Sequence, residues 1–319
     1  MVRSNIFSNL IAKSPTSFTY FVGGLEIQSS HVLFSEENVE VMLSPIIEND
    51  GEHIMLSIPN NSPLCREEIA IIKTKIIFNF KKKLLFNRIF CDSKIKNILV
   101  SLRIFYPKNI LFVRPWPTND HRIRKNSIAE KESITMDKVG FSEFSTFCNK
   151  YSLFCKGIDG KGKDMELLTG QSNSKEYHII KRLNNSWENK DIIECLIDLI
   201  IAFDSIFGER HESTYKVALR SAFFIGKSAQ ERKTIFEFIR VLYDIRSRII
   251  HENKIIKELE DEVSKSVKKK LILFDDVTDF MTASFKLEYL LKKVLHKMIS
   301  TEVHLPKNNN YFDALLFEN

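Results

Sequence analysis

Arg246 and His251 are the residues of this chain whose types and spacing could do chemistry. They lie five positions apart, at the end of a strongly amphipathic segment that closes with residues 243–251. An arginine holds a phosphate group at any physiological pH, and a histidine gives and takes protons near neutrality. If the fold presents both side chains to one cleft, they are enough to cleave RNA without a metal ion.

The spacing of the apolar residues predicts that this segment is a helix. At 100° per residue, with Tyr243 at zero, Arg246 lies at about −60°, Ser247 at about +40° and His251 at about +80°. The apolar positions lie between about −100° and −160° by the same count, so these four residues share a face beside the core. Such a face is typical of a helix that lines a cleft or a dimer seam. Arginine and histidine near a helix C-terminus also favour the helix dipole without any further function.

From about residue 172 the chain is predicted to be entirely helical. Apolar periodicity indicates four or five helices, which include residues 174–183, residues 192–207 and a last long helix through residues 280–298. Short connections join them, except for the charged segment 252–270. Helix ends are indicated by capping or closing residues: Gly208, Ser213, Gly226, the capping box that begins at Ser228, and Asp275 or Asp276.

Three short sequence words in these helices carry a resemblance to a known family. They are Phe203-Asp204-Ser205-Ile206-Phe207, Ala218-Leu219-Arg220-Ser221-Ala222 and Leu242-Tyr243-Asp244-Ile245-Arg246-Ser247-Arg248-Ile249-Ile250-His251. In their order and approximate spacing they resemble the HEPN superfamily, most of all its ApeA-like branch, over roughly residues 172–305. The defining motif of that superfamily is an arginine, four to six residues, and a histidine; Arg246 and His251 have four residues between them.

The sequence departs from the family pattern at three positions. Many family members have glutamate where Asp204 stands, so the acid is shorter here by one methylene group. The residue after the motif arginine is often asparagine or another polar residue, and here it is Ser247. Glycine commonly follows the motif histidine, whereas this chain has Glu252.

The resemblance implies a helical bundle that dimerises, so that two arginine–histidine pairs face one cleft, and a metal-independent endoribonuclease. Many such proteins act in phage defence by abortive infection, in toxin–antitoxin pairs or in RNA processing. Arg246 and His251 would be catalytic, and Tyr243, Ser247 and Asp204 would support them, Asp204 by pairing with Arg246. The partners implied are RNA, with tRNA as one candidate, a second copy of the chain, and an antitoxin or a phage-derived trigger.

The chemistry fits these residue types. A neutral His251 would take the proton of a ribose 2′-hydroxyl, and the partner's His251 would protonate the leaving oxygen. Arg246 would offset the charge on the phosphate oxygens. Because this route needs the 2′-hydroxyl, we expect cleavage of RNA and none of DNA. The alternatives are a non-catalytic HEPN-like dimerisation or sensing module, and a toxin whose partner blocks or modifies this face at Tyr243.

Residues 1–171 are predicted to form a mixed α/β recognition or regulatory region, with a subdivision near residue 118 as an option. Short apolar runs predict strands at 18–22, 31–34, 39–43 and 54–58, with a hairpin at 49–51 between the last two. Further predictions are a helix over residues 69–85, strands at 98–105 and 110–113 ended by the prolines at 115–117, an aromatic-rich core helix over 141–154 and a connecting segment at 157–163. The predicted class is therefore α+β, with a β-rich mixed N-terminal region followed by an all-α HEPN-like bundle over residues 172–319.

Positive charge gathers in residues 69–125. This stretch has nine Lys and five Arg against two Asp, a net charge of +12, although the whole chain carries only +6. A local positive field of this size suits a polyanion such as RNA. For the lysine triplet alone, the solvated face of a helix is the better interpretation. The candidate RNA-binding residues are Lys81, Lys82, Lys83, Arg122, Arg124 and Lys125.

Composition excludes several other classes of protein. Five cysteines, an odd number, fit neither a zinc knuckle nor a disulfide framework, and the histidines form no HxxxH or HExxH pattern, so we expect no metal and no cofactor. We expect reduced, mostly buried thiols. The N-terminus shows no signal peptide, and the most apolar stretch, residues 192–207, is interrupted by Glu194, Asp198 and Asp204. We therefore expect a cytoplasmic protein with no membrane partner.

Overall fold

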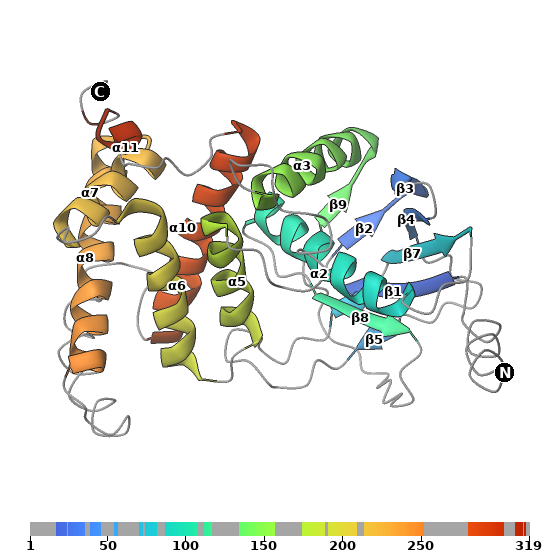
Figure 1. The fold of residues 1–319 in the computed structure, drawn as a ribbon, viewed down its shortest axis with the longest axis horizontal. Coiled ribbons are helices and arrows are strands. Elements are labelled where there is room, and N and C mark those ends of the chain that lie inside the picture. Colours follow the sequence, from blue (N-terminus) through green and yellow to red (C-terminus); the bar gives the residue numbers. More distant parts are fainter. Residues whose placement is uncertain are drawn as a thin grey trace, which may run out of the picture. The chain divides into compact units, whose positions relative to one another are not determined.

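A computed structural model supplies the structure, and the α+β class follows from it. It describes residues 17–23, 25–35, 39–45, 54–56, 70–72, 74–81, 87–107, 112–116, 134–156, 174–188, 191–208, 214–251, 280–302, 310–314 and 316. Every described strand lies between residues 17 and 136, and every described element after residue 137 is a helix. This distribution confirms the predicted α+β class (Figure 1).

The largest sheet of the N-terminal part has five antiparallel strands in the order β3-β4-β7-β1-β8. The strands are β1 Ser17–Gly23, β3 His31–Ser35, β4 Val39–Pro45, β7 Thr74–Phe80 and β8 Phe112–Trp116. Ile76 of the central strand faces Tyr20 on one side and Leu43 on the other, and all three are buried. The predicted strands at 18–22, 31–34 and 39–43 are confirmed as β1, β3 and β4.

The predicted hairpin at residues 49–51 is wrong in its pairing. β5 (Ile54–Leu56) pairs with β6 (Ala70–Ile72) in a separate two-stranded sheet, whereas β4 pairs with β3 and β7. The turn residues themselves lie outside the described part of the chain. A local turn signal cannot reveal that a strand farther along the sequence competes for the same edge. The third sheet joins β2 (Leu25–Ile27) and β9 (Ile134–Met136) in parallel.

The helix that we predicted over residues 69–85 is also wrong, because its described part forms the strands β6 and β7. Thr74, Ile76 and Phe78 are buried at every second position, which is the period of a strand. Isoleucine is β-branched and favours strands. The strands β6 and β7 are short and follow each other closely in the sequence. Their apolar residues therefore recur at intervals of three and four, which is the spacing expected of a helix.

Residues 98–105 form the end of helix α2 (Asn87–Phe105), so the predicted strand there is wrong as well. Ile98, Leu102 and Phe105 recur at intervals of three and four, and the first two are buried. The strand predicted at 110–113 is shifted, since β8 runs from Phe112 to Trp116 and includes Pro115. A proline is tolerated in β8 because it is an edge strand of the sheet.

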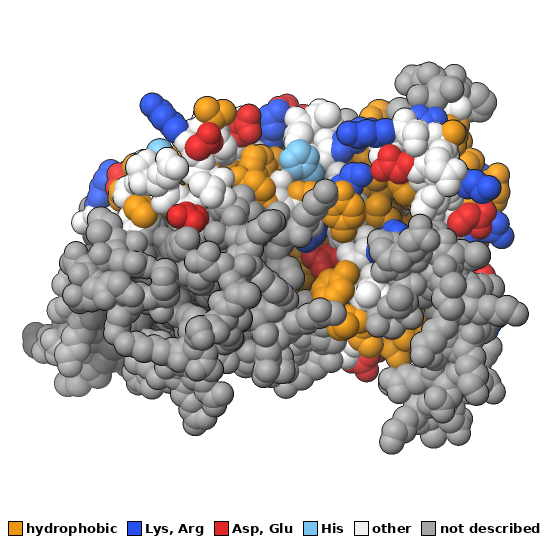
Figure 2. All heavy atoms as spheres, turned by 180° about the vertical axis from the view of Figure 1, so that it is seen from behind, with side chains coloured by type: hydrophobic (Ala, Val, Ile, Leu, Met, Phe, Trp, Pro, Cys, Tyr) orange, Lys and Arg blue, Asp and Glu red, His pale blue; other side chains and the backbone are white. Residues whose placement is uncertain are grey.

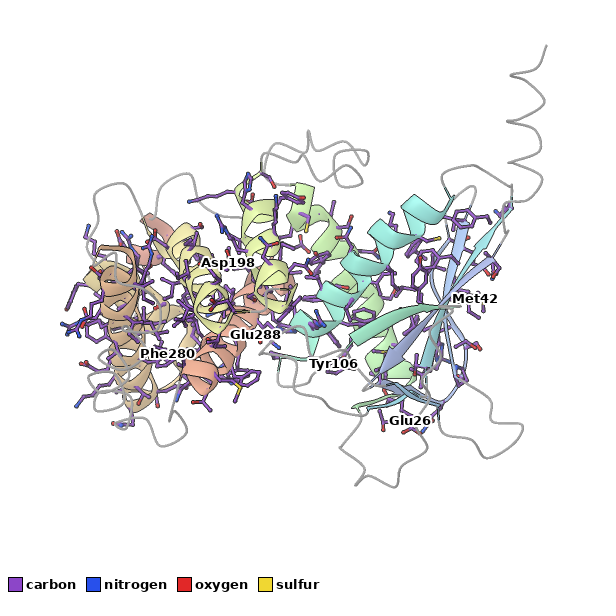
Figure 3. The ribbon with its side chains drawn as sticks, turned by 90° about the horizontal axis from the view of Figure 1, so that it is seen from below. Glu26, Met42, Tyr106, Asp198, Phe280 and Glu288 are labelled. Atoms are coloured by element: carbon purple, nitrogen blue, oxygen red, sulfur yellow. The ribbon has the colours of Figure 1, made fainter. Side chains whose placement is uncertain are left out.

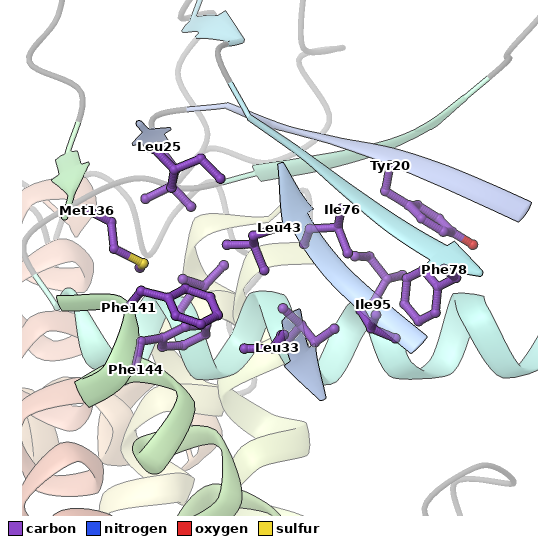
Figure 4. Close-up of a cluster of buried hydrophobic side chains, with 14 of the residues drawn as sticks. Tyr20, Leu25, Leu33, Leu43, Ile76, Phe78, Ile95, Met136, Phe141 and Phe144 are labelled. Atoms are coloured by element: carbon purple, nitrogen blue, oxygen red, sulfur yellow. The ribbon is translucent and has the colours of Figure 1, made fainter. Parts of the chain in front are cut away.

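A hydrophobic core lies between this sheet and two helices, α2 and α3 (Lys138–Lys156) (Figure 4). The aromatic helix predicted over residues 141–154 is confirmed as α3, and its aromatic residues are buried as expected: Phe141, Phe144, Phe147, Tyr151 and Phe154. The predicted connection at residues 157–163 lies outside the described part.

The C-terminal helices are α5 Lys175–Glu188, α6 Ile192–Phe207, α7 Thr214–Ile225, α8 Ala229–His251, α10 Phe280–Ser300 and α11 Asn310–Ala314. α6 packs against α5 and α10, and α7 packs against α8 (Figure 1). The predicted helices of this region are confirmed, while Ser213, Asp275 and Asp276 lie outside the described residues. Contacts divide the chain into two compact units, and the second contains Ser172–Asn319 together with Asn60–Arg66 and Leu153–Gly162.

None of the helices in the described ranges is both long enough and apolar enough to span a membrane.

Candidate functional site

Helix α8 carries the Arg246 segment and begins with the predicted capping box. The Ser228 hydroxyl accepts a hydrogen bond of 3.1 Å from the Glu231 backbone N–H. The Glu231 carboxylate in turn accepts a hydrogen bond of 3.0 Å from the Lys227 backbone N–H. That bond is the main reason why the pKa of Glu231 is lowered. These bonds satisfy N–H groups that a helix start otherwise leaves without partners. The apolar stripe of α8 is then buried: Ile235, Phe238, Ile239, Leu242 and Ile245.

Tyr243 joins α8 to α6. Its hydroxyl donates a 3.0 Å hydrogen bond to Oδ1 of Asp204, and the side chain is only 9% exposed. Burial raises the pKa of Tyr243, and the charge and hydrogen bond of Asp204 raise it further, while Arg246 acts against them. The phenol therefore stays protonated at neutral pH and remains a donor to the Asp204 carboxylate.

Asp204 lies in the last turn of α6, and Gly208 closes that turn. The Gly208 N–H donates 2.8 Å to the Asp204 carbonyl oxygen. A Cβ at Gly208 would lie 2.6 Å from that oxygen and 2.8 Å from Oδ1 of Asp204. A residue without a side chain is therefore needed here because the Asp204 carboxylate approaches so closely.

Arg246 lies one turn after Tyr243. Its guanidinium carbon is 6.0 Å from the centroid of the Tyr243 ring, within range of a cation–π contact. Its Nε is buried and has no hydrogen-bond partner among the described residues. We expected Asp204 to pair with Arg246, and the structure corrects this: Asp204 accepts from Tyr243. A buried charged donor without an acceptor carries an energetic cost, so an oxyanion would be stabilised there.

Ser247 is exposed directly after Arg246, and His251 is the last residue of α8. The His251 side chain lies outside what the structure describes. The five intervals between Arg246 and His251 correspond to a rise of about 7.5 Å along the axis. The structure thus brings together Asp204, Tyr243 and Arg246.

The basic residues of the N-terminal part are mostly outside the described chain. Of the six candidates, only Lys81 is described, and it is exposed on a bend directly after β7. The interpretation of Lys81 as part of a solvated helix face is therefore wrong. Lys82, Lys83, Arg122, Arg124 and Lys125 lie outside the described ranges. On the face drawn in Figure 2, described lysine and arginine side chains are interspersed with acidic and hydrophobic ones.

Arg220 is a buried cation to which we assigned no role. It is 1% exposed and makes a two-pronged contact with Asp313 of α11, at 2.7 Å from Nε and 2.9 Å from Nη2. Its Nη1 donates 2.9 Å to the carbonyl oxygen of Phe207, the last residue of α6. Phe312, fully buried, lies against the rings of Phe207 and Phe224. An arginine inside an apolar helical run was the sequence signal for this cluster.

Two more ion pairs lie among α5, α6 and α10, and each holds a buried carboxylate. Arg182 bonds to Asp198, one of the acids that interrupt the apolar stretch of α6. Lys292 is 2.8 Å from Glu288, one turn away on α10. Figure 3 shows Asp198 and Glu288 among the side chains of these helices. Their partners explain their burial without a catalytic role.

The remaining nucleophiles and metal ligands are not arranged for chemistry in the described part. Cys91, Cys155 and Cys195 are buried, and burial with nearby carboxylates raises the pKa of Cys195 to about 12, so its thiol is not ionised at neutral pH. No group of three or more His, Cys, Asp or Glu side chains in that part could hold a metal ion.

Comparison with protein-family models, with curated proteins and with solved structures finds no match to this chain.

Proposed function

We propose that the C-terminal helices form a HEPN-like domain and that the protein is a metal-independent endoribonuclease acting as a dimer. The observation that carries the proposal is the buried Nε of Arg246, which has no acceptor among the described residues and lies on the helix that ends at His251. A phosphate oxygen would supply the missing acceptor. The Tyr243–Asp204 bond supports the proposal because it fixes the ring beside which the guanidinium lies.

In the reaction, Arg246 holds the scissile phosphate and offsets the negative charge that develops on its oxygens. Neutral His251 removes the proton of the ribose 2′-hydroxyl, whose oxygen then attacks the adjacent phosphorus. The bond from phosphorus to the 5′-oxygen breaks, and a proton from the histidine of a second copy goes to that oxygen. The products are a 2′,3′-cyclic phosphate end and a 5′-hydroxyl end.

The biological setting that we propose is phage defence by abortive infection or a toxin–antitoxin pair, with the protein in the cytoplasm. An RNA, a second copy of the chain and an antitoxin or phage-derived trigger would be its partners. The basic region that includes Lys81 would hold RNA or sense the trigger. Growth arrest on expression of the wild-type chain, but not of His251→Ala, would support this setting.

The decisive experiment is cleavage of total RNA by purified protein in EDTA. We expect wild-type protein to produce cyclic-phosphate ends, and His251→Ala to produce none. His178 is an exposed histidine on α5, so His178→Ala is the matched control and should cleave like wild type. Cleavage of DNA, a requirement for metal, or equal cleavage by His251→Ala would overturn the mechanism. Growth arrest that persists in the Arg246→Ala/His251→Ala variant would instead favour a non-catalytic sensing module.

A further inference from the structure

The Arg246 face of α8 continues toward the start of the helix. At 100° per residue, Phe236 lies at about +20° and Arg240 at about +60° from Tyr243, which is the side that Ser247 also occupies. Arg240 is exposed and Phe236 is half-buried. The catalytic motif therefore ends a longer strip of basic and aromatic residues, which the same angular count could have revealed from the sequence.

An exposed aromatic ring from α7 extends this strip. The Tyr215 side chain is 54% exposed, and its ring lies edge-on to Phe236, with centroids 5.2 Å apart and planes at 79°. The guanidinium carbon of Arg240 lies 5.5 Å from the Phe236 centroid. A ring held by a neighbouring ring and open to solvent can stack on a nucleic-acid base.

The charge of α8 favours a polyanion on this face. The helix has five basic residues and three acidic ones, and one of the acids, Glu231, is paired with Lys293 of α10. Lys233 and Arg240 are exposed, and neither has an ion-pair partner among the described residues, although Glu237 and Asp244 each lie one turn further on. A solvated face of alternating charge accounts for the acids but not for the exposed Tyr215 ring that lies against Phe236.

We propose that Tyr215, Phe236, Lys233 and Arg240 form a binding surface for single-stranded RNA that leads to Arg246; we name it the α8 strip. A base stacks on Tyr215, and phosphates lie at Lys233 and Arg240. Ten intervals separate Phe236 from Arg246, a rise of about 15 Å, which a few stacked nucleotides span. Duplex RNA is excluded because its bases are not free to stack on a side chain. The inference rests on the proposed ribonuclease function.

The test measures binding separately from cleavage. The probe is a short 2′-O-methylated single-stranded RNA, which lacks the attacking hydroxyl, and its affinity for the full chain is read by fluorescence anisotropy. Tyr215→Ala should weaken binding about fivefold or more. Arg240→Ala should reduce the slope of log K against log salt by about 0.7, the effect of one lost phosphate contact.

Two variants outside the strip serve as matched controls. Tyr311 on α11 is another exposed tyrosine, and Lys181 on α5 is an exposed lysine. Tyr311→Ala and Lys181→Ala should bind like wild type. Equal loss in all four variants would overturn the strip, because the effect would then be general.

The outcomes also separate the strip from the proposed function. If the wild-type protein cleaves RNA, and Tyr215→Ala binds and cleaves RNA as well as wild type does, only the α8 strip is overturned. Tyr215-dependent binding by a protein that never cleaves supports the strip and opposes the ribonuclease proposal. A preference for duplex RNA over single-stranded RNA overturns the strip. The strip is also overturned if Tyr215→Ala loses dimerisation and keeps its RNA affinity, because a second copy of the chain would then occupy this face.

Discussion

Arg220 and Arg246 lie in the same helical unit and have opposite surroundings. Arg220 is fully buried, and all three of its guanidinium nitrogens donate, two to Asp313 and one to the Phe207 carbonyl. Arg246 is partly exposed, and its buried Nε has no acceptor among the described residues. A satisfied buried cation holds a fold together, whereas a buried donor without an acceptor costs stability and gains from any ligand that reaches it. The two arginines therefore predict different consequences of mutation.

The largest effect is expected for Arg220→Ala. It removes a buried cation with three hydrogen bonds, leaves a cavity and leaves the Phe207 carbonyl without its donor. We expect a loss of about 3–5 kcal/mol in the free energy of unfolding, measured by chemical denaturation.

Asp313→Ala is the informative control for that prediction, because the Asp313 side chain is 41% exposed whereas the Arg220 side chain is buried. α11 has five residues and is too short to be stable alone. It can detach and let water reach Arg220, so the loss should be smaller than for Arg220→Ala. An equal or larger loss in Asp313→Ala would show that α11 cannot detach.

The C-terminal helical unit was easier to predict from the sequence than the N-terminal unit, for a physical reason. Helices such as α6 and α8 form from contacts three and four residues apart, which the periodicity and the capping box at Ser228 contain. β7 is specified by pairing with β1 and β4, more than 25 residues away, so residues 69–85 were misread. Within the site, the shared face of Tyr243 and Arg246 was predictable. The bond from Tyr243 to Asp204, 39 positions earlier, was not, because it depends on how two helices pack.

Tyr243→Phe should have an intermediate effect. It removes the hydrogen bond to the Asp204 carboxylate but keeps the ring, and Asp204 is only half-buried and can be hydrated instead. We expect a loss of about 1–2 kcal/mol in unfolding free energy and a lower rate of RNA cleavage, because the ring beside Arg246 is less fixed. Unchanged stability together with unchanged cleavage would mean that the bond does not position Arg246.

Acid should weaken the Arg220 cluster. The Arg220 hydrogen bonds hold the pKa of Asp313 below its usual value of 3.8. A lowered pKa in the folded state contributes stability above the unfolded pKa, and this is lost as the pH falls through the folded value. The melting temperature should therefore drop below about pH 4 more steeply in wild type than in Asp313→Asn. Glu231 titrates in the same direction, so the difference between the two proteins is the quantity to measure.

The smallest effect on stability, and the largest contrast with Arg220, is expected for Arg246→Met. Methionine keeps an apolar stem against the Tyr243 ring and removes the buried donor, for which the described part of the chain offers no acceptor. Since no hydrogen bond of Nε is lost, the unfolding free energy should stay within about 1 kcal/mol of wild type, or rise. RNA cleavage should nevertheless disappear, because nothing then offsets the charge on the phosphate. A strong destabilisation would instead show that Arg246 holds the fold as Arg220 does, and the site would lose its main argument.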